Sequence, residues 1–384
     1  MAKYGDKGNN RSIDLNNSTI NNTQLNPNLL SSSRKKRGLK TKLDVKLIFF
    51  RQLSVILQSG VPLSQGLQLL SENITDKKFG ACIEDISSQL SSGIELSVAL
   101  RQYPKIFDPI IVGLIEAGEA GGILSEVLER IAALLDSQNK LKSQITGALI
   151  YPVILLILAL SVSLGLLVFI VPTFEELFNG LGADLPGLTQ FMLDLSRLVT
   201  SPMFVIVAPL ISILLFISYL QYYSSIKGKL LLDTFFLKIP IFGDLILRSE
   251  LASLSDTFST LINAGLTITE ALEKCILSAS NQIIKNVIEK SVTLVQEGQL
   301  LSYSFGLSKN IPKLFVSMIK IGEETGELSF MMEKISIFYK REVEESVSIL
   351  TRLMEPAVIF IVAAIVGTIV IALYLPMFSL LEKI

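Results

Sequence analysis

The chain has 384 residues, of which 50% are hydrophobic and 18% charged, and its formal net charge is −1. This charge gives no general attraction to nucleic acid, and the absence of histidine excludes histidine-ligated metals and a Ser-His-Asp triad. Cys82 and Cys275 are too few for a cysteine-rich metal site, and their apolar surroundings predict small buried side chains.

Residues 1–44 are predicted to form a disordered polar and basic tail. The first 33 residues are rich in Asn and Ser and lack the apolar stretch of a cleavable secretion signal. A basic run follows from Arg34 to Lys42. It is either a solvated part of the tail or a contact for anionic lipid headgroups or an acidic partner. No aromatic residues are interleaved with these charges, which argues against direct nucleic-acid binding.

Residues 45–148 are predicted to form a first cytoplasmic module, a compact bundle of five or six short helices. Apolar residues recur at spacings of three and four, as on one face of a helix, and strand-type alternation is not sustained. Helix breaks are expected at Gly60, Gly93, Pro104 and residues 118–122. A small all-helical bundle satisfies this pattern.

Three long stretches of the chain carry no charged residue. Each offers about 20 apolar residues, enough to cross a hydrocarbon core about 30 Å thick. We predict transmembrane helices at residues 149–172, 203–223 and 354–378. Pro152 and Pro356 would lie in the first turns of their spans, where proline is tolerated.

The distribution of Lys and Arg predicts the orientation of the spans. The region before the first span holds 18 of the 34 basic residues, and the region between the second and third spans holds 14. Arg197 is the only basic residue of the segment 173–202, and Lys383 is the only basic residue of the tail 379–384. Positive-inside logic places the N-terminus in the cytoplasm and the C-terminus, with both of these segments, in the periplasm.

Residues 224–353 are predicted to repeat the first module. Gly60 corresponds to Gly265 at an offset of 205 residues. The sequence AGEAGGIL (117–124) corresponds to IGEETGEL (321–328) at an offset of 204. Thr267 and Glu270 have capping-box spacing at a helix start. The fold class predicted is an all-α membrane protein with two duplicated cytoplasmic helical bundles and three transmembrane helices.

The most distinctive repeated motif is Gly-Glu-x-x-Gly. It comprises Gly118, Glu119 and Gly122 in the first copy, and Gly322, Glu323 and Gly326 in the second. We expect the last Gly to end one helix in a left-handed conformation, with Glu near the positive end of the next helix. Partner contact or ion binding by the two glutamates is the alternative.

A second repeated feature lies at the cytoplasmic mouths of the first and third spans. Tyr151 and Pro152 correspond to Glu355 and Pro356 at an offset of 204. Glu355 is either an interfacial charge or a polar lock to a neighbouring helix or subunit.

The sequence predicts no catalytic, cofactor-binding or metal-binding residues. It has no phosphate-binding loop of the GxxxxGK[ST] type and no GxGxxG turn. The predicted spans contain tyrosines but no Asp, Glu, Lys or Arg in their interiors, whereas coupled transporters usually hold such a group. A non-enzymatic scaffold is therefore favoured, and a membrane transporter or channel subunit is the alternative.

The chain resembles the type II secretion F family, which includes the inner-membrane platform proteins of type IV pilus assembly. The resemblance runs from about residue 46 to the end of the chain. It is carried by FRQLSVILQSGVPLSQGL, FDPIIVGLIEAGEAGGILSEVLERIA, QITGALIYPVILL, VPTFEELFNGLGADLPGLTQ, IPKLFVSMIKIGEETGEL, FYKREVEESVSILTRLMEPAVI and ALYLPMFSL.

This resemblance implies a scaffold in the bacterial inner membrane. Its partners would be a cytoplasmic hexameric assembly or retraction ATPase, pilin or pseudopilin subunits, and other inner-membrane subunits of the machine. A homo-oligomer is also implied. Pilus assembly, secretion and DNA uptake all remain open at this point, because such machines share parts.

Overall fold

The computed structural model describes residues 40–180 and 186–381, so most of the predicted tail lies outside the described residues. The described part is helical and contains no strand. The first half comprises α2 (Leu43–Gln58), α3 (Leu63–Asn73), α4 (Lys77–Ser91), α5 (Leu96–Arg101), α6 (Pro109–Gly121), α7 (Leu124–Gly165), the π-helical turn η1 (Leu166–Ile170) and α8 (Val171–Gly180). Next come α9 (Gly187–Thr200), α10 (Pro202–Ser224) and α11 (Ile226–Lys238). The second half comprises α12 (Phe242–Asn263), α13 (Ile268–Ser278), α14 (Gln282–Gln296), α15 (Leu301–Gly306), α16 (Lys313–Thr325) and α17 (Leu328–Leu381).

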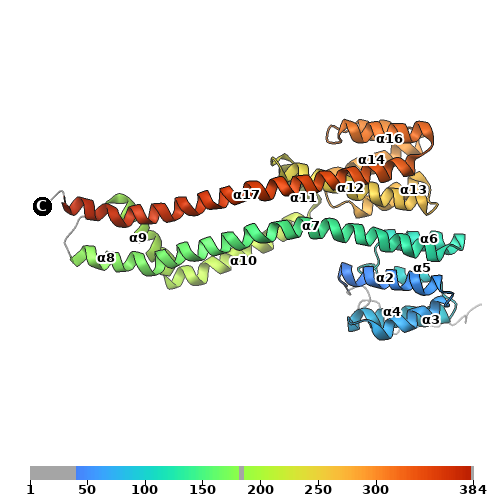
Figure 1. Cartoon of the computed structure of the whole chain (residues 1–384), viewed down its shortest axis with the longest axis horizontal. Coiled ribbons are helices and arrows are strands. Elements are labelled where there is room, and N and C mark those ends of the chain that lie inside the picture. The colour runs from blue at the N-terminus through green and yellow to red at the C-terminus, as the bar shows by residue number, and fades with distance from the viewer. Residues whose placement is uncertain (1–39, 181–185, 382–384) are drawn as a thin grey trace, which may run out of the picture.

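The two predicted modules are two bundles of matching helices at one end of the molecule (Figure 1). Helices α2 to α6 pack with the start of α7, and α12 to α16 pack with the start of α17. Side-chain caps fix several helix starts. Asp76 caps α4, Asp108 caps α6, and the predicted capping box of Thr267 and Glu270 is present on α13.

Glycines in the left-handed region end equivalent helices in the two modules. Gly60 lies just after the end of α2, and Gly265 lies just after the end of the equivalent helix α12. Their φ values are 85° and 92°. Only glycine adopts this conformation without a steric cost, which explains why the residue recurs at both positions. The predicted breaks at these two glycines are confirmed.

Each module passes into the membrane through one unbroken helix. Helix α7 has 42 residues and α17 has 54, and both run in parallel from the module end toward the spans (Figure 1). Pro152 and Pro356 therefore lie inside helices, and the prediction that they occupy first turns was wrong. The residues before each proline continue the amphipathic pattern of the module, so the helix begins far upstream of the apolar stretch.

Within the described residues, three helices are long and apolar enough to cross a membrane, as the sequence predicted. They are Leu124–Phe174, Pro202–Tyr223 and Leu328–Pro376. Large apolar side chains cover their outer surfaces, including Ile157, Ile213 and Phe360. Such exposure is stable only where lipid rather than water surrounds the helix.

The far end of the spans is closed by α9, a helix that sequence analysis did not predict. Met192 and Leu193 of α9 join Leu167 and Ile369 in a small apolar cluster between the first and third spans. The hydroxyl of Ser196 donates to the carbonyl of Leu167 at the π-helical turn, at 2.6 Å. The spacing of Leu188, Met192, Leu195 and Val199 was the signal that could have revealed this helix.

One continuous apolar core extends through both modules. It includes Phe50, Phe79 and Phe107 from the first copy and Phe305 and Phe315 from the second. The modules meet where α6 packs against α13. Both cysteines are buried within this core, as predicted, and burial raises the pKa of the Cys275 thiol above its ordinary value.

Candidate functional site

The glutamate of each Gly-Glu-x-x-Gly motif caps a short helix elsewhere in its module. The Glu119 carboxylate accepts hydrogen bonds from the backbone amides of Leu96 at 2.6 Å and Ser97 at 3.1 Å, at the start of α5. A negative charge at a helix N-terminus is stabilised by the free amides and by the helix dipole.

The second copy repeats this arrangement with the equivalent residues. The Glu323 carboxylate accepts hydrogen bonds from Leu301 at 2.5 Å and Ser302 at 3.0 Å, at the start of α15. The sequence predicted a glutamate near the next helix along the chain, which would be α7 or α17. The structure instead places each glutamate at the start of the helix that precedes its own, which is α5 for Glu119 and α15 for Glu323.

The two glycines of each motif serve different purposes. Gly122 and Gly326 have φ values of 67° and 74° and form the predicted left-handed helix ends. A Cβ on Gly118 would lie 3.0 Å from the Cβ of Val127, and the equivalent distance from Gly322 to the Cβ of Met331 is also 3.0 Å. The absent side chain thus allows α6 to approach α7, and α16 to approach α17, closely.

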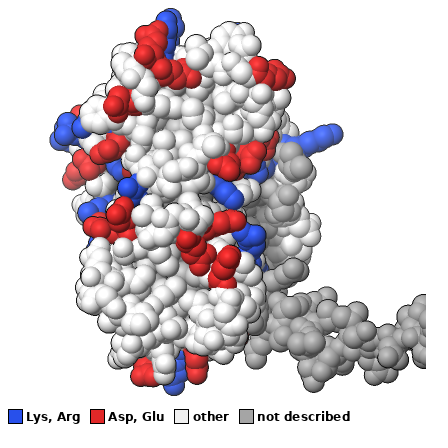
Figure 2. Space-filling model, turned by 90° about the vertical axis from the view of Figure 1, so that its right-hand side faces the viewer, with Lys and Arg blue, Asp and Glu red and all other residues white. Residues whose placement is uncertain are grey.

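These two motifs lie at the end of the molecule that is farthest from the membrane spans (Figure 1). Figure 2 views this end directly and shows acidic and basic side chains interspersed over it. Among the ion pairs on the helices of the two modules, Arg101 of α5 lies 2.8 Å from Glu116 of α6, and Lys320 lies 3.7 Å from Glu324 on α16. The capped helices therefore support a surface of mixed charge on the side away from the bilayer.

An ion pair joins the first and last helix of each module, with the charges exchanged between the copies. In the first module Arg51 of α2 lies 3.5 Å from Asp136 of α7. The equivalent positions hold Asp256 of α12 and Lys340 of α17, which lie 2.8 Å apart. The duplication thus kept the location of the pair while reversing its polarity.

The start of α14 is anchored to the helices that lead out of the second span. Asp233 of α11 accepts a hydrogen bond from the amide of Gln282, and Glu250 of α12 accepts from the amides of Ser280 and Asn281. Burial raises the pKa of Glu250, and the neighbouring Asp233 carboxylate adds to this, whereas the two amide hydrogen bonds oppose it. The contact of Asp233 attaches α11 to the second module, and neither contact was predicted from the sequence.

The residues predicted at the mouths of the spans do not converge on a site. The side chains of Tyr151, Glu355 and Pro356 are exposed, and Pro152 is buried. A second contact between the two chain segments that include the long helices lies nearer the modules. There the amide of Gln144 donates to Glu344 at 2.8 Å, beside a small apolar cluster that includes Val343 and Leu350.

Among residues 40–180 and 186–381, no group of three or more His, Cys, Asp or Glu side chains is placed to hold a metal ion. The two motif glutamates belong to separate modules and are each occupied with backbone amides. The arrangement consists of two helical bundles, each joined by a continuous helix to a segment apolar enough to span a membrane.

Comparison with known proteins gives matches over nearly the whole chain. The family profile described as "Type II secretion system (T2SS), protein F" matches twice, at residues 49–172 and 254–376. Both matches begin in the first helices of a module and end in a membrane span. They therefore coincide with the two structural copies.

Several curated proteins are similar in sequence to this chain. Type IV pilus assembly protein PilC of Thermus thermophilus is 35% identical over 338 residues, which is 87% of this chain and 82% of that protein. Type IV pilus assembly protein PilC of Pseudomonas aeruginosa is 34% identical, over 89% of this chain and 91% of that protein. Type II secretion system protein F of Xanthomonas campestris is 30% identical, over 88% of this chain and 82% of that protein.

Proposed function

Because the chain belongs to the type II secretion system protein F family, we propose that it couples a cytoplasmic hexameric motor ATPase to the assembly of pilin subunits. The chain is a multi-pass inner-membrane platform protein of a type IV pilus or type II secretion machine. The pilus machine is the one we propose, because the relatives named for pilus assembly reach 35% and 34% identity, against 30% for the secretion protein of Xanthomonas campestris.

The continuity of α7 and α17 is the observation that carries this proposal. At 1.5 Å per residue, helices of 42 and 54 residues extend about 60 Å and about 80 Å. A displacement of a module can therefore reach the bilayer through a rigid element. The modules would receive motion from the motor, and the spans would pass it to pilin subunits in the membrane.

In this proposal the chain supplies mechanical coupling and performs no catalysis, so the partner hydrolyses the nucleotide. The N-terminus and both modules lie in the cytoplasm, at residues 45–148 and 224–353. The segment 173–202 and the C-terminus lie in the periplasm. The distribution of Lys and Arg supports this orientation, since residues 1–148 and 224–353 together hold 32 of the 34 Lys and Arg residues.

Deletion of the gene tests the role in the machine. Cells that lack the chain are expected to lose surface pili, as counted by electron microscopy, while retaining the motor ATPase and the pilin in the inner membrane. Expression of the full chain in the deletion strain should restore them. Normal numbers of pili in the deletion strain, with loss of type II secretion instead, would reassign the chain to the secretion machine.

A further inference from the structure

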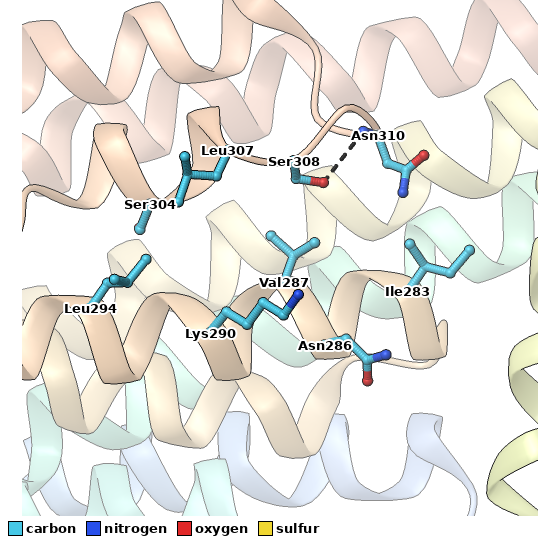
Figure 3. Close-up of a pocket in the computed structure, with 9 residues that line it drawn as sticks. All are labelled: Ile283, Asn286, Val287, Lys290, Leu294, Ser304, Leu307, Ser308 and Asn310. Atoms are coloured by element: carbon cyan, nitrogen blue, oxygen red, sulfur yellow. Dashed lines mark hydrogen bonds between the residues drawn. The ribbon is translucent and has the colours of Figure 1, made fainter.

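The second module contains an open groove between α14 and the turn that follows α15. Its volume is about 340 Å³. Figure 3 shows Val287 and Lys290 of α14 on one side, facing Leu307 and Ser308 on the other. The volume lies near the lower end of the range for ligand-binding pockets, so the groove suits one side chain with its neighbouring atoms.

The equivalent seam of the first module is closed by a tyrosine. Tyr103 occupies the position that corresponds to Ser308, and only 2% of its surface is exposed. Its hydroxyl donates to the carboxylate of Asp85 on α4 at 2.6 Å. Burial and this hydrogen bond raise the pKa of Tyr103 above its ordinary value, so the phenol remains a donor.

A second polar contact closes the first module beside the tyrosine. The side-chain amide of Gln102 donates to Gln89 of α4 at 2.6 Å. In the second module Leu307 and Leu294 take the places of these two glutamines. The polar closure of the first copy is therefore replaced by two apolar walls.

The charge at the seam is also reversed between the copies. Lys290 stands where the first module has Asp85, and its side chain is exposed. No ion pair of Lys290 occurs within the part of the chain that the structure describes. The hydroxyl of Ser308 accepts a hydrogen bond from the backbone amide of Asn310 at 3.3 Å. Because serine has no ring, the space that the ring of Tyr103 fills in the first module is left unfilled here.

We propose that this groove binds an aromatic side chain of a partner protein, presented on a segment that carries an adjacent carboxylate. The first module provides the template, because its seam holds an aromatic ring at the same place. The apolar walls of Val287, Leu294 and Leu307 would cover the ring, as apolar surfaces do in most small binding sites. Lys290 would form an ion pair with the carboxylate of the partner. It stands at the position of Asp85, whose carboxylate accepts the hydrogen bond of Tyr103 in the first module.

The proposal makes the second module the docking copy and the first module its closed counterpart. The proposal holds for any partner protein that carries such a segment. It also holds whether the machine assembles pili or secretes proteins.

A capped dipeptide, acetyl-Tyr-Asp-amide, tests the groove in the full chain reconstituted in nanodiscs. Methyl NMR signals of Val287, Leu294 and Leu307 are expected to shift on titration. Acetyl-Tyr-Lys-amide should bind about tenfold more weakly, a difference typical of one charge-assisted contact. The Lys290→Asp variant should reverse this order of affinity.

The Ser308→Tyr variant should abolish the shifts, because it refills the groove as Tyr103 fills the first module. Ser317→Tyr adds the same side chain at an exposed site on α16 and should leave binding intact. The combination Ser308→Tyr with Lys290→Asp should raise the melting temperature, since it rebuilds the closed seam. Unchanged binding by Ser308→Tyr, absence of shifts at the three methyl groups, or tighter binding of adenosine monophosphate than of acetyl-Tyr-Asp-amide would each overturn the proposal.

Discussion

Replacement of Glu323 by alanine is expected to lower the free energy of unfolding of the second module by about 2–4 kcal/mol. The substitution leaves the amides of Leu301 and Ser302 without their acceptor at the partly buried start of α15, and each such loss costs about 1–3 kcal/mol. It also removes a negative charge from the positive end of the helix. Glu119→Ala should have the same effect in the first module, through Leu96 and Ser97.

Hydrogen exchange measures this prediction at the affected amides. Exchange at Leu301 and Ser302 should accelerate in Glu323→Ala, together with a lower melting temperature. Glu323→Gln keeps one acceptor oxygen, so its melting temperature should lie between those of the unmodified chain and Glu323→Ala. Glu324→Ala is the matched control, because Glu324 is exposed and pairs with Lys320 on its own helix, so its loss should cost less than about 0.5 kcal/mol. Equal stability of the Glu323→Ala and Glu324→Ala variants would refute the capping role.

Reversal of one charge in the second module is the other substitution with a large expected effect. Lys340→Asp places two carboxylates together at a position where the side chains of Lys340 and Asp256 are only 29% and 19% exposed. We expect a loss of about 2–3 kcal/mol, because a partly buried pair is converted into a repulsion. The hydroxyl of Ser336, which also contacts Asp256, remains available to only one of the two carboxylates.

The double variant Asp256→Arg with Lys340→Asp should recover most of this stability. It reproduces in the second module the polarity that Arg51 and Asp136 have in the first. Denaturant midpoints of the two single variants and the double variant form a double-mutant cycle that isolates the pair. If the two single losses simply add in the double variant, the side chains are not coupled and the prediction fails.

The reversed polarity has a consequence for folding of the duplicated chain. If α2 packed on α17 instead of α7, Arg51 would face Lys340. The complementary error, α12 on α7, would bring Asp256 against Asp136. Like charges at these positions would disfavour each wrong pairing, so the exchange of signs helps each module to select its own long helix.

The spans and the duplication could be predicted from the sequence because their signals are local and strong. An uncharged stretch or a repeated glycine is visible without knowledge of any contact. The helix capped by Glu119 could not be predicted in the same way, because the carboxylate and the amide of Leu96 are 23 residues apart. Proximity in the chain favoured α7, whereas the hairpin of α5 and α6 brings the carboxylate to α5.

The other differences have a similar origin. Proline at residue 152 suggested a helix start, yet the helix continues because both flanking segments are strongly helical and the loss of one backbone hydrogen bond is tolerated. The groove at Ser308 could not be predicted from the sequence. The exchange of Tyr103 for Ser308 indicates a groove only when the structures of the two modules are compared. The anchoring of α14 by Glu250 could not be predicted from the repeat, because the equivalent position of the first module holds Val45, which has no carboxylate.

Binding of the motor ATPase to the full chain in nanodiscs tests the central claim most directly. The proposed function predicts saturable binding of a hexameric motor ATPase from the same organism, and nucleotide hydrolysis only in the presence of that ATPase. Protection from hydrogen exchange should appear on the two modules and not on the segment 186–202. Absence of binding to nanodiscs that carry the correctly folded chain, or protection confined to the segment 186–202, would contradict the account.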